Sequence, residues 1–193
     1  MGREEEARAT REALIAAALE LFAERGYAGV GTEEIVKRAK VTRGALYHHF
    51  EDKRDLFREV HERTEKRVVD EIAARMTGLS DPWEVIVTGM RSFLDACEDP
   101  AAKRIALIDA PVVLGWREWR EIDERYGLGL LKAALGGAME AGVLREGPLD
   151  SLSHLMLGAL AEAAFMIANA DDPVAARAEA EDGVLTLLGG LRA

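Results

Sequence analysis

The stretch from Thr32 to Lys53, TEEIVKRAKVTRGALYHHFEDK, constrains the fold of this chain more than any other. Thr32 and Thr42 are of a residue type that caps helix N-termini, and two glutamates follow Thr32 where the helix dipole favours carboxylates. The apolar positions that would pack two short helices together are Ile35, Ala39, Val41 and Leu46. Ala39 is small, as a close helix crossing requires. The pattern predicts a helix-turn-helix, followed near Asp52 by the start of a third helix.

The ordered string Gly-x-Leu-Tyr-x-His-Phe-x-x-Lys-x-x-Leu runs from Gly44 to Leu56. It follows an amphipathic first helix that ends in Leu21, Phe22, Arg25, Gly26 and Tyr27. These residues resemble the DNA-binding domain of the tetracycline-repressor (TetR) family of bacterial transcription regulators. The resemblance is sharp over the first quarter of the chain and architectural beyond it. Two positions depart from the family pattern: Val36 replaces a small alanine, and Lys40 stands in the turn where glycine is usual, which predicts a strained or altered backbone there.

The resemblance implies that Arg43 to His49 form the helix that enters the DNA major groove. Arg43 has the side chain for a bidentate contact with guanine, and Lys53 begins a helix whose N-terminus attracts phosphate. The residues expected to contact DNA are Thr32, Lys40, Thr42, Arg43, Gly44, Ala45, Tyr47, His48, His49 and Lys53. Tyr47 could instead be a core aromatic, and His48 and His49 could be solvated surface residues, whereas Phe50 is better explained as core.

Charge is unevenly distributed along the chain. The formal net charge is −10, from 25 Lys and Arg against 35 Asp and Glu. Residues 1–53 contain nine basic and ten acidic residues, which gives −1 and leaves −9 for the remainder. Within the motif, Lys37, Arg38, Lys40 and Arg43 form a basic cluster with no acid among them. We therefore expect DNA affinity that falls as the salt concentration rises.

Helix signals punctuate the rest of the sequence, and strand signals are absent. Three Asp-Pro pairs begin at Asp81, Asp99 and Asp172, and each suits a helix N-cap with proline at the first helical position. We expect about nine helices, near residues 4–25, 32–39, 43–49, 52–76, 82–97, 100–109, 116–141, 149–169 and 173–190. The predicted fold is all-α, with a helix-turn-helix DNA-binding domain at 1–53. A long helix joins it to an effector-binding and dimerisation domain at 54–193.

The sequence favours a cytoplasmic location and no membrane contact. No signal peptide is visible, and the longest run without Asp, Glu, Lys or Arg is Ser151 to Ala161, far short of a membrane span. The single Cys97 excludes an internal disulfide and suits a reducing compartment.

Large aromatic side chains gather between residues 82 and 141, the region that forms a small-molecule pocket in the family. Such pockets are mostly apolar with a few placed polar groups. The candidate effector contacts are Met90, Phe93, Leu94, Trp116, Trp119 and Tyr126, with Arg91 or Asp109 as orienting groups. The alternative is that these aromatics are ordinary core.

Two charge-poor segments near the C-terminus predict a homodimer. The expected interface residues are Leu152, Leu155, Met156, Ala159, Leu160, Ala163, Met166, Leu185 and Leu188. Two such helices from each subunit would form a four-helix interface, and a two-fold dimer suits a palindromic operator in double-stranded DNA. The alternative is an intramolecular core.

Catalysis is not expected. None of the histidines at 48, 49, 61 and 154 has a glutamate three residues before it, as di-iron bundles require. There is no phosphate-binding glycine loop and no nucleophile elbow. Cys97 is expected to be a buried small hydrophobe. The sequence therefore predicts no enzyme, no metal site and no cofactor.

Together these features predict a ligand-responsive transcription regulator, most simply a repressor that a small, largely apolar effector releases from its operator. The alternative is a DNA-anchored adaptor whose C-terminal domain binds a protein partner instead of a small molecule.

Overall fold

The computed structural model describes residues 2–193, and over that range the chain is helical with one isolated β-bridge, between Leu144 and Arg192. The helices are α1 (Arg3–Arg25), α2 (Thr32–Ala39), α3 (Arg43–His49), α4 (Lys53–Met76), α5 (Pro82–Ala96), α6 (Pro100–Ala102), α7 (Ala110–Leu114), α8 (Trp116–Asp123), α9 (Gly129–Glu140), α10 (Leu149–Asn169) and α11 (Pro173–Gly189). Two π-helical segments, η1 (Lys103–Asp109) and η2 (Glu124–Leu128), connect α6 to α7 and α8 to α9. If α6, η1 and α7 are counted as one helix, and α8, η2 and α9 as another, the described residues form nine helices. The all-α prediction is therefore confirmed.

The chain forms two compact units, Met1–Thr64 with Pro100–Trp119 and Glu65–Asp99 with Arg120–Ala193. We call them the first and second unit. The predicted boundary after residue 53 does not coincide with this division, because residues 54–64 and 100–119 pack with the N-terminal helices. Helix α4 supplies residues to both units, as does α8.

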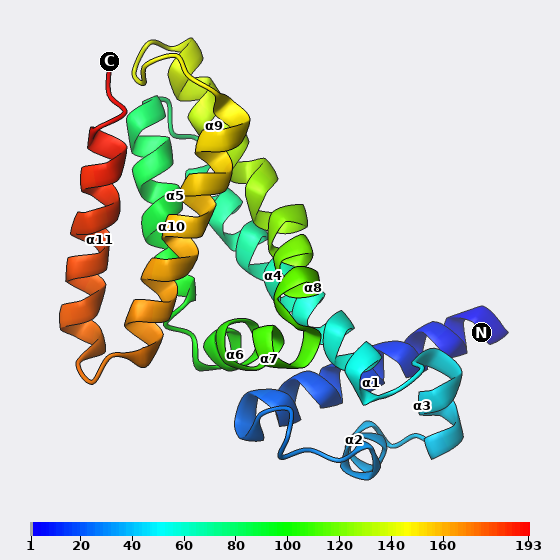
Figure 1. Ribbon diagram of the computed structural model, residues 1–193. Coiled ribbons are helices and arrows are strands. Elements are labelled where there is room, and N and C mark those ends of the chain that lie inside the picture. Colours follow the sequence, from blue (N-terminus) through cyan, green and yellow to red (C-terminus); the bar gives the residue numbers. More distant parts are fainter. Residues whose placement is uncertain (1) are drawn as a thin grey trace. The chain divides into compact units, whose positions relative to one another are not determined.

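The core of the first unit is built where α1 to α4 meet (Figure 1). Phe22, Tyr27 and Phe57 form an aromatic cluster with ring centroids 5.1 to 5.7 Å apart. Ile35 from α2 and Leu46 from α3 are fully buried, as the helix-turn-helix pattern predicts. Phe50 is only 3% exposed, which confirms it as a core residue.

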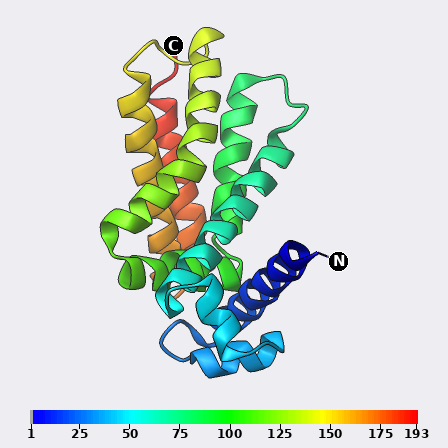
Figure 2. The same ribbon diagram turned by 90° about the vertical axis from the view of Figure 1, so that its right-hand side faces the viewer.

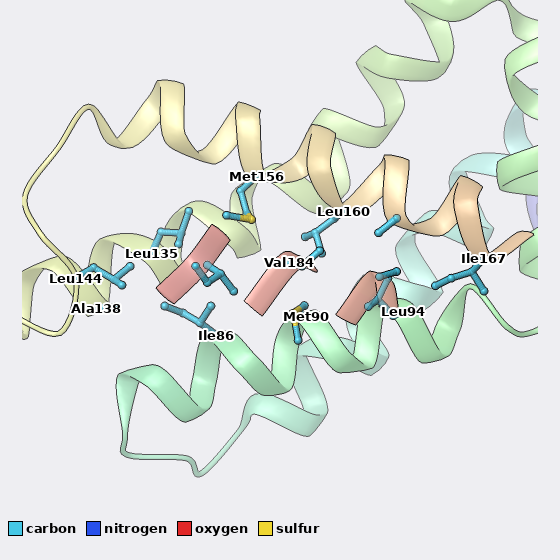
Figure 3. Packing of buried hydrophobic residues seen from close by; sticks show 13 residues of the cluster. Ile86, Met90, Leu94, Leu135, Ala138, Leu144, Met156, Leu160, Ile167 and Val184 are labelled. Carbon is cyan, nitrogen blue, oxygen red and sulfur yellow. The ribbon is translucent and has the colours of Figure 1, made fainter. Parts of the chain in front are cut away.

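The second unit packs α5, α9, α10 and α11 side by side (Figure 2). Their inward faces form an aliphatic core in which Met90, Met156, Leu160 and Val184 point toward one another (Figure 3). Helix α10 alone among the described residues is long and apolar enough to cross a membrane by length and composition. Because many of its apolar side chains are buried within this core, α10 is better explained as a core helix.

Local chemistry sets most helix boundaries. The Asp81 side chain accepts a hydrogen bond from the Trp83 N–H, and Asp172 accepts from the N–H groups of Val174 and Ala175, as the Asp-Pro pairs predict. Thr42 caps α3 by accepting from the Ala45 N–H at 3.1 Å. These caps satisfy backbone donors that a helix N-terminus leaves open.

The predicted cap at Thr32 is wrong. Gly31 occupies the N-cap of α2, and Thr32 is the first helical residue. The Glu34 side chain instead accepts from the Gly31 N–H at 3.4 Å, while its other oxygen accepts from Arg25. Glu34 therefore binds the backbone of the N-cap residue, and α2 begins at Thr32, where the predicted helix begins, although no side chain caps its first turn.

Candidate DNA-binding surface and effector cavity

Helix α3 presents its polar face to solvent while its apolar face fills the core of the first unit. Thr42, Arg43, Gly44, Tyr47 and His48 are exposed, with Tyr47 at 45%. Leu46 between them is fully buried and anchors the helix. A short helix fixed in this way can offer one face to the major groove.

Arg43 is held in place on this face by two neighbours. Its guanidinium lies 5.6 Å from the centroid of the Tyr47 ring and 3.7 Å from a carboxylate oxygen of Glu33. Both ion-pair partners are largely exposed, so the pair contributes little to stability and leaves Arg43 available to a base or phosphate. Tyr47 is a surface residue, which removes the alternative of a core aromatic.

The two histidines of α3 differ in environment. Their rings lie 5.1 Å apart, edge to face. His48 is exposed and His49 half-buried. Burial, His48 and Arg11 all lower the pKa of His49, which favours the neutral form of this side chain.

Lys53 has a structural role that the sequence did not reveal. Its ammonium donates to the carbonyl oxygens of Tyr27 and Val30, both at 2.9 Å, and lies 3.9 Å from the centroid of the Tyr27 ring. Burial lowers its pKa. The side chain thus holds the loop between α1 and α2, and a phosphate contact at this position would use the backbone at the start of α4 instead.

The remaining predicted DNA contacts surround α3. Lys40 is exposed and adopts a left-handed backbone, with φ 56° and ψ 38°, as its place in the turn predicts. Thr32 and Ala45 are half-buried. Eight of the ten predicted residues therefore lie on α3 or in the turn before it, whereas Thr32 begins α2 and Lys53 begins α4.

Residues 100–119 support the helix-turn-helix from within the first unit. Asp109 at the end of η1 accepts a hydrogen bond from the Tyr27 N–H at 2.7 Å. Arg54 near the start of α4 donates to the carbonyl oxygens of Val113 and Leu114. Asp109, considered earlier as an effector-orienting group, is thus committed to the DNA-binding helices.

The second unit contains a partly open cavity of about 70 Å³. This is several times the space that one water requires. Its walls come from α4, α5, α9, α10 and α11, together with η2 and the last residue of α8. Most of the lining is aliphatic, methionine or phenylalanine, and the only ionisable side chains in it are Glu65 and Asp123.

Both carboxyl groups are perturbed by this setting. Burial, reinforced by the nearby Asp123 charge, raises the pKa of Glu65 to about 8. Glu65 is half-buried, and it lines the cavity. Burial also raises the pKa of Asp123 to about 6, against the opposing effect of Arg120, whose Nη1 lies 2.8 Å from Oδ2. Burial therefore favours the protonated form of both carboxyls, and more strongly for Glu65 than for Asp123.

Two of the six predicted effector contacts, Met90 and Phe93, line the cavity. Leu94 is fully buried in the adjacent core, and Tyr126 is half-buried outside the lining. Trp116 and Trp119 belong to the first unit, where Trp116 is 66% exposed and the buried Trp119 donates from Nε1 to the Ala106 carbonyl oxygen. Aromatic content alone did not distinguish a cavity wall from ordinary packing.

Sequence reasoning missed Glu65 and Asp123, although a signal existed. Glu65 is three and seven residues before the buried Val68 and Ile72, so it lies on the apolar stripe of α4. Asp123 is four residues after the buried Trp119. Acidic residues on the buried stripe of a helix are seldom buried without a role. Arg91, the other proposed orienting group, pairs with Glu181 at 2.7 Å and does not line the cavity.

The predicted dimer residues divide into three groups by exposure. Met156, Leu160, Ala163 and Leu188 are buried within their own chain, so they are core and not available to a partner. Leu155 and Met166 are 70% and 48% exposed, and Leu187, which was not predicted, is 55% exposed. Leu152, Ala159 and Leu185 are half-buried. Helices α10 and α11 are apolar on more than one side, so the sequence did not separate their inner and outer faces.

No cluster of three or more potential metal ligands among His, Cys, Asp and Glu occurs within residues 2–193. Cys97 is buried, and burial raises the pKa of its thiol to about 12, so the thiolate is strongly disfavoured. His154 is exposed beside Glu124, at 3.4 Å.

Comparisons with known proteins agree with this arrangement. Residues 14–60 match the family described as bacterial regulatory proteins, tetR family, and residues 83–191 match the tetracyclin repressor-like C-terminal domain. The TetC protein of transposon Tn10 from Escherichia coli is 28% identical over 156 residues, which cover 81% of this chain and 79% of TetC. A TetR-family transcriptional regulator from Pectobacterium atrosepticum has a crystal structure that is 34% identical, with a TM-score of 0.87 over 100% of this chain and 98% of that one.

A second solved structure, RolR in complex with the ligand resorcinol, is 26% identical with a TM-score of 0.76. It covers 96% of this chain, and the match covers 90% of RolR. Since the two family models together match residues 14–60 and 83–191, the chain belongs to the TetR family of bacterial transcriptional regulators, which are DNA-binding proteins.

Proposed function

We propose that this protein is a cytoplasmic, homodimeric repressor that binds a palindromic operator and is released when a small molecule occupies the cavity of the second unit. The observation that carries the proposal is that the same chain has an anchored, solvent-facing α3 and a largely apolar cavity in its second unit. A repressor needs both a sequence reader and a site at which a signal is received.

The reading half of the proposal rests on α3. Arg43 would contact guanine or phosphate, and Tyr47 and His49 would contact the backbone on either side. Lys37 and Lys40 are exposed nearby and add positive charge toward phosphate.

The sensing half rests on the continuity of α4. Leu56 and Phe57 of this helix are buried in the core of the first unit, where Phe57 packs against Phe22 and Tyr27, while Val68, Ile72 and Met76 line the cavity. A change at the cavity that shifts the second half of α4 would be carried along one continuous helix toward the DNA-binding helices. We propose that the effector favours a dimer conformation in which the two α3 helices no longer match successive major grooves.

The dimer rests on the exposed apolar side chains of the last two helices. Leu155, Met166 and Leu187 expose about half or more of their surface, and the small Gly158 and Ala159 lie on the same helix, α10. A two-fold pairing through α10 and α11 would cover these side chains. Glu162 and Asp182 are also exposed there, so the interface would carry a polar rim.

The proposal is tested by selecting random duplex DNA on the purified protein and measuring affinity for the enriched sequence. We expect a palindrome, with affinity reduced about tenfold to a hundredfold by Arg43→Ala and reduced by Tyr47→Ala. Lys66→Ala removes an exposed basic side chain of the second unit and serves as the matched control. If the protein showed only salt-sensitive, sequence-independent binding, the proposed recognition of an operator by α3 would be contradicted. If a protein partner but no small molecule released the DNA, the adaptor function would be favoured.

A further inference from the structure

An acidic side chain stands beside the basic residue that is expected to contact DNA. Glu33 lies in the first turn of α2, and its Oε1 is 3.7 Å from Nη1 of Arg43 on α3. The Glu33 side chain is 84% exposed, so the two groups meet on the surface of the first unit and not in its core. Because phosphates repel a carboxylate, a glutamate at this place opposes binding to DNA of any sequence. Its effect on binding must therefore be sought in selectivity, since it adds nothing to the overall attraction.

The two adjacent glutamates of α2 have different partners. Glu34 accepts a hydrogen bond from the Gly31 N–H and pairs with Arg25 at the end of α1. Those contacts tie the start of α2 to its own backbone and to α1. Glu33 instead pairs with Arg43, and an ion pair exposed to this extent contributes little to stability. The consequence of the Glu33–Arg43 pair therefore lies in how Arg43 is presented to DNA.

The Arg43 guanidinium is approached from two sides. The Tyr47 ring, one helical turn further along α3, lies with its centroid 5.6 Å from the guanidinium carbon, and Glu33 approaches Nη1 from α2. A guanidinium has five N–H donors, so a carboxylate near Nη1 leaves others for a ligand. Guanine offers O6 and N7, which accept hydrogen bonds without carrying a full charge. A phosphate carries a full negative charge, so the Glu33 carboxylate repels it where it would tolerate guanine.

We propose that Glu33 is a specificity-determining residue, whose carboxylate penalises contact of Arg43 with phosphate more than contact of Arg43 with guanine. The inference rests on the function proposed above, because it requires α3 to enter the major groove of an operator. Binding to DNA of unrelated sequence comes almost entirely from charge, whereas operator binding adds contacts with base edges. Glu33 therefore lowers the affinity for unrelated DNA more than the affinity for the operator.

The test compares two duplexes, the operator selected by the parent protein and a scrambled duplex of the same length and composition. The affinity of the full-length protein for each is measured over a range of salt concentrations. Glu33→Gln keeps the size of the side chain and removes its charge. We expect affinity for the scrambled duplex to rise about threefold to tenfold, with a salt dependence steeper by about one phosphate contact.

Affinity for the operator should change less in the same variant. Removing the carboxylate relieves repulsion there too, but it also removes a group that orients Arg43 toward the base. We expect operator affinity to stay within about twofold of the parent value, so the ratio of operator affinity to scrambled affinity should fall by about threefold or more.

Two further comparisons show whether Glu33 acts through Arg43. In the Arg43→Ala background, Glu33→Gln should change both affinities by the same factor and leave their ratio unchanged, because the guanidinium is gone. Glu24→Gln removes the same charge from an exposed position on α1 and is the matched control. It should leave the affinity ratio of the parent protein unchanged.

An affinity ratio that Glu33→Gln leaves unchanged would overturn the inference, as would an equal fall of the ratio in the Arg43→Ala background or in Glu24→Gln. A lower operator affinity without a gain on the scrambled duplex would also overturn it, in favour of a direct contact between Glu33 and a base. If the parent protein selects no sequence, the proposed function fails and this inference fails with it. If the parent selects an operator and Glu33→Gln leaves the ratio unchanged, the inference fails alone.

Discussion

The two units of this protein have different kinds of core, and the same helix, α4, contributes residues to both. In the first unit, α4 contributes Phe57 to a cluster of touching aromatic rings. In the second unit, the same helix contributes Glu65 and Val68 to the wall of a cavity. Close packing holds α3 in one position, whereas incomplete packing leaves room for a ligand and lowers the cost of rearrangement. The proposed function would use the tightly packed unit to read DNA and the unit with the cavity to receive a signal.

The contrast in packing predicts a difference in the cost of truncation. Phe57→Ala should lower the free energy of unfolding by about 3–5 kcal/mol, because a fully buried ring leaves a new cavity between Phe22 and Tyr27. Phe93→Ala should cost roughly half as much, because its ring already borders empty space. Urea unfolding followed by circular dichroism measures both. Equal losses would show that the cavity wall is packed as tightly as the aromatic cluster.

The two units should also respond to pH in opposite directions. Burial lowers the pKa of His61 in the first unit from its ordinary value near 6.5 to about 4. Between pH 6.5 and pH 4, His61 is therefore protonated in the unfolded chain but neutral in the folded chain. Its contribution to stability is therefore complete above pH 6.5 and is lost as pH falls, by up to about 3 kcal/mol. Glu65, with its raised pKa, destabilises the fold as pH rises from about 4.5 to 8 instead.

The His61→Gln variant isolates the contribution of His61 to the pH dependence of stability. The difference in unfolding free energy between parent and variant, measured at intervals from pH 7 to pH 4, should shift in favour of the variant as pH falls. If the difference in unfolding free energy stayed constant across that range, His61 would titrate normally in the folded protein. His61 and Glu65 would then not affect the pH dependence of stability in opposite directions.

The smallest predicted effect concerns the turn between α2 and α3. Lys40→Gly should raise stability by about 0.5 kcal/mol, because glycine adopts the left-handed backbone without the Cβ penalty but loses more chain entropy. The same change should weaken operator binding several-fold if Lys40 contacts phosphate. Lys37→Gly, within α2, is the matched control and should destabilise by about 1 kcal/mol. If both variants lost the same amount of stability, the left-handed backbone at Lys40 would carry no strain that glycine relieves.

Much of the fold was predictable because its signals are local. Asp81, Asp172 and Thr42 form caps by hydrogen bonding to backbone groups two or three residues away, so the helix boundaries follow from short stretches of sequence. Thr32 failed as a cap because Gly31 and Glu34 provide an equally local alternative. The candidate effector site was only partly predictable, since Met90 and Phe93 line it but Trp116 and Trp119 do not.

The sequence by itself determined the helical class, the helix-turn-helix, the left-handed turn at Lys40 and the polar face of α3, because these depend on spacing and backbone chemistry within a few residues. Only the tertiary structure decided that Lys53 binds the carbonyls of Tyr27 and Val30, and that Glu65 and Asp123 share a cavity. Those groups come from segments 23 to 58 residues apart. Their meeting depends on how helices pack, which periodicity along a single helix does not specify.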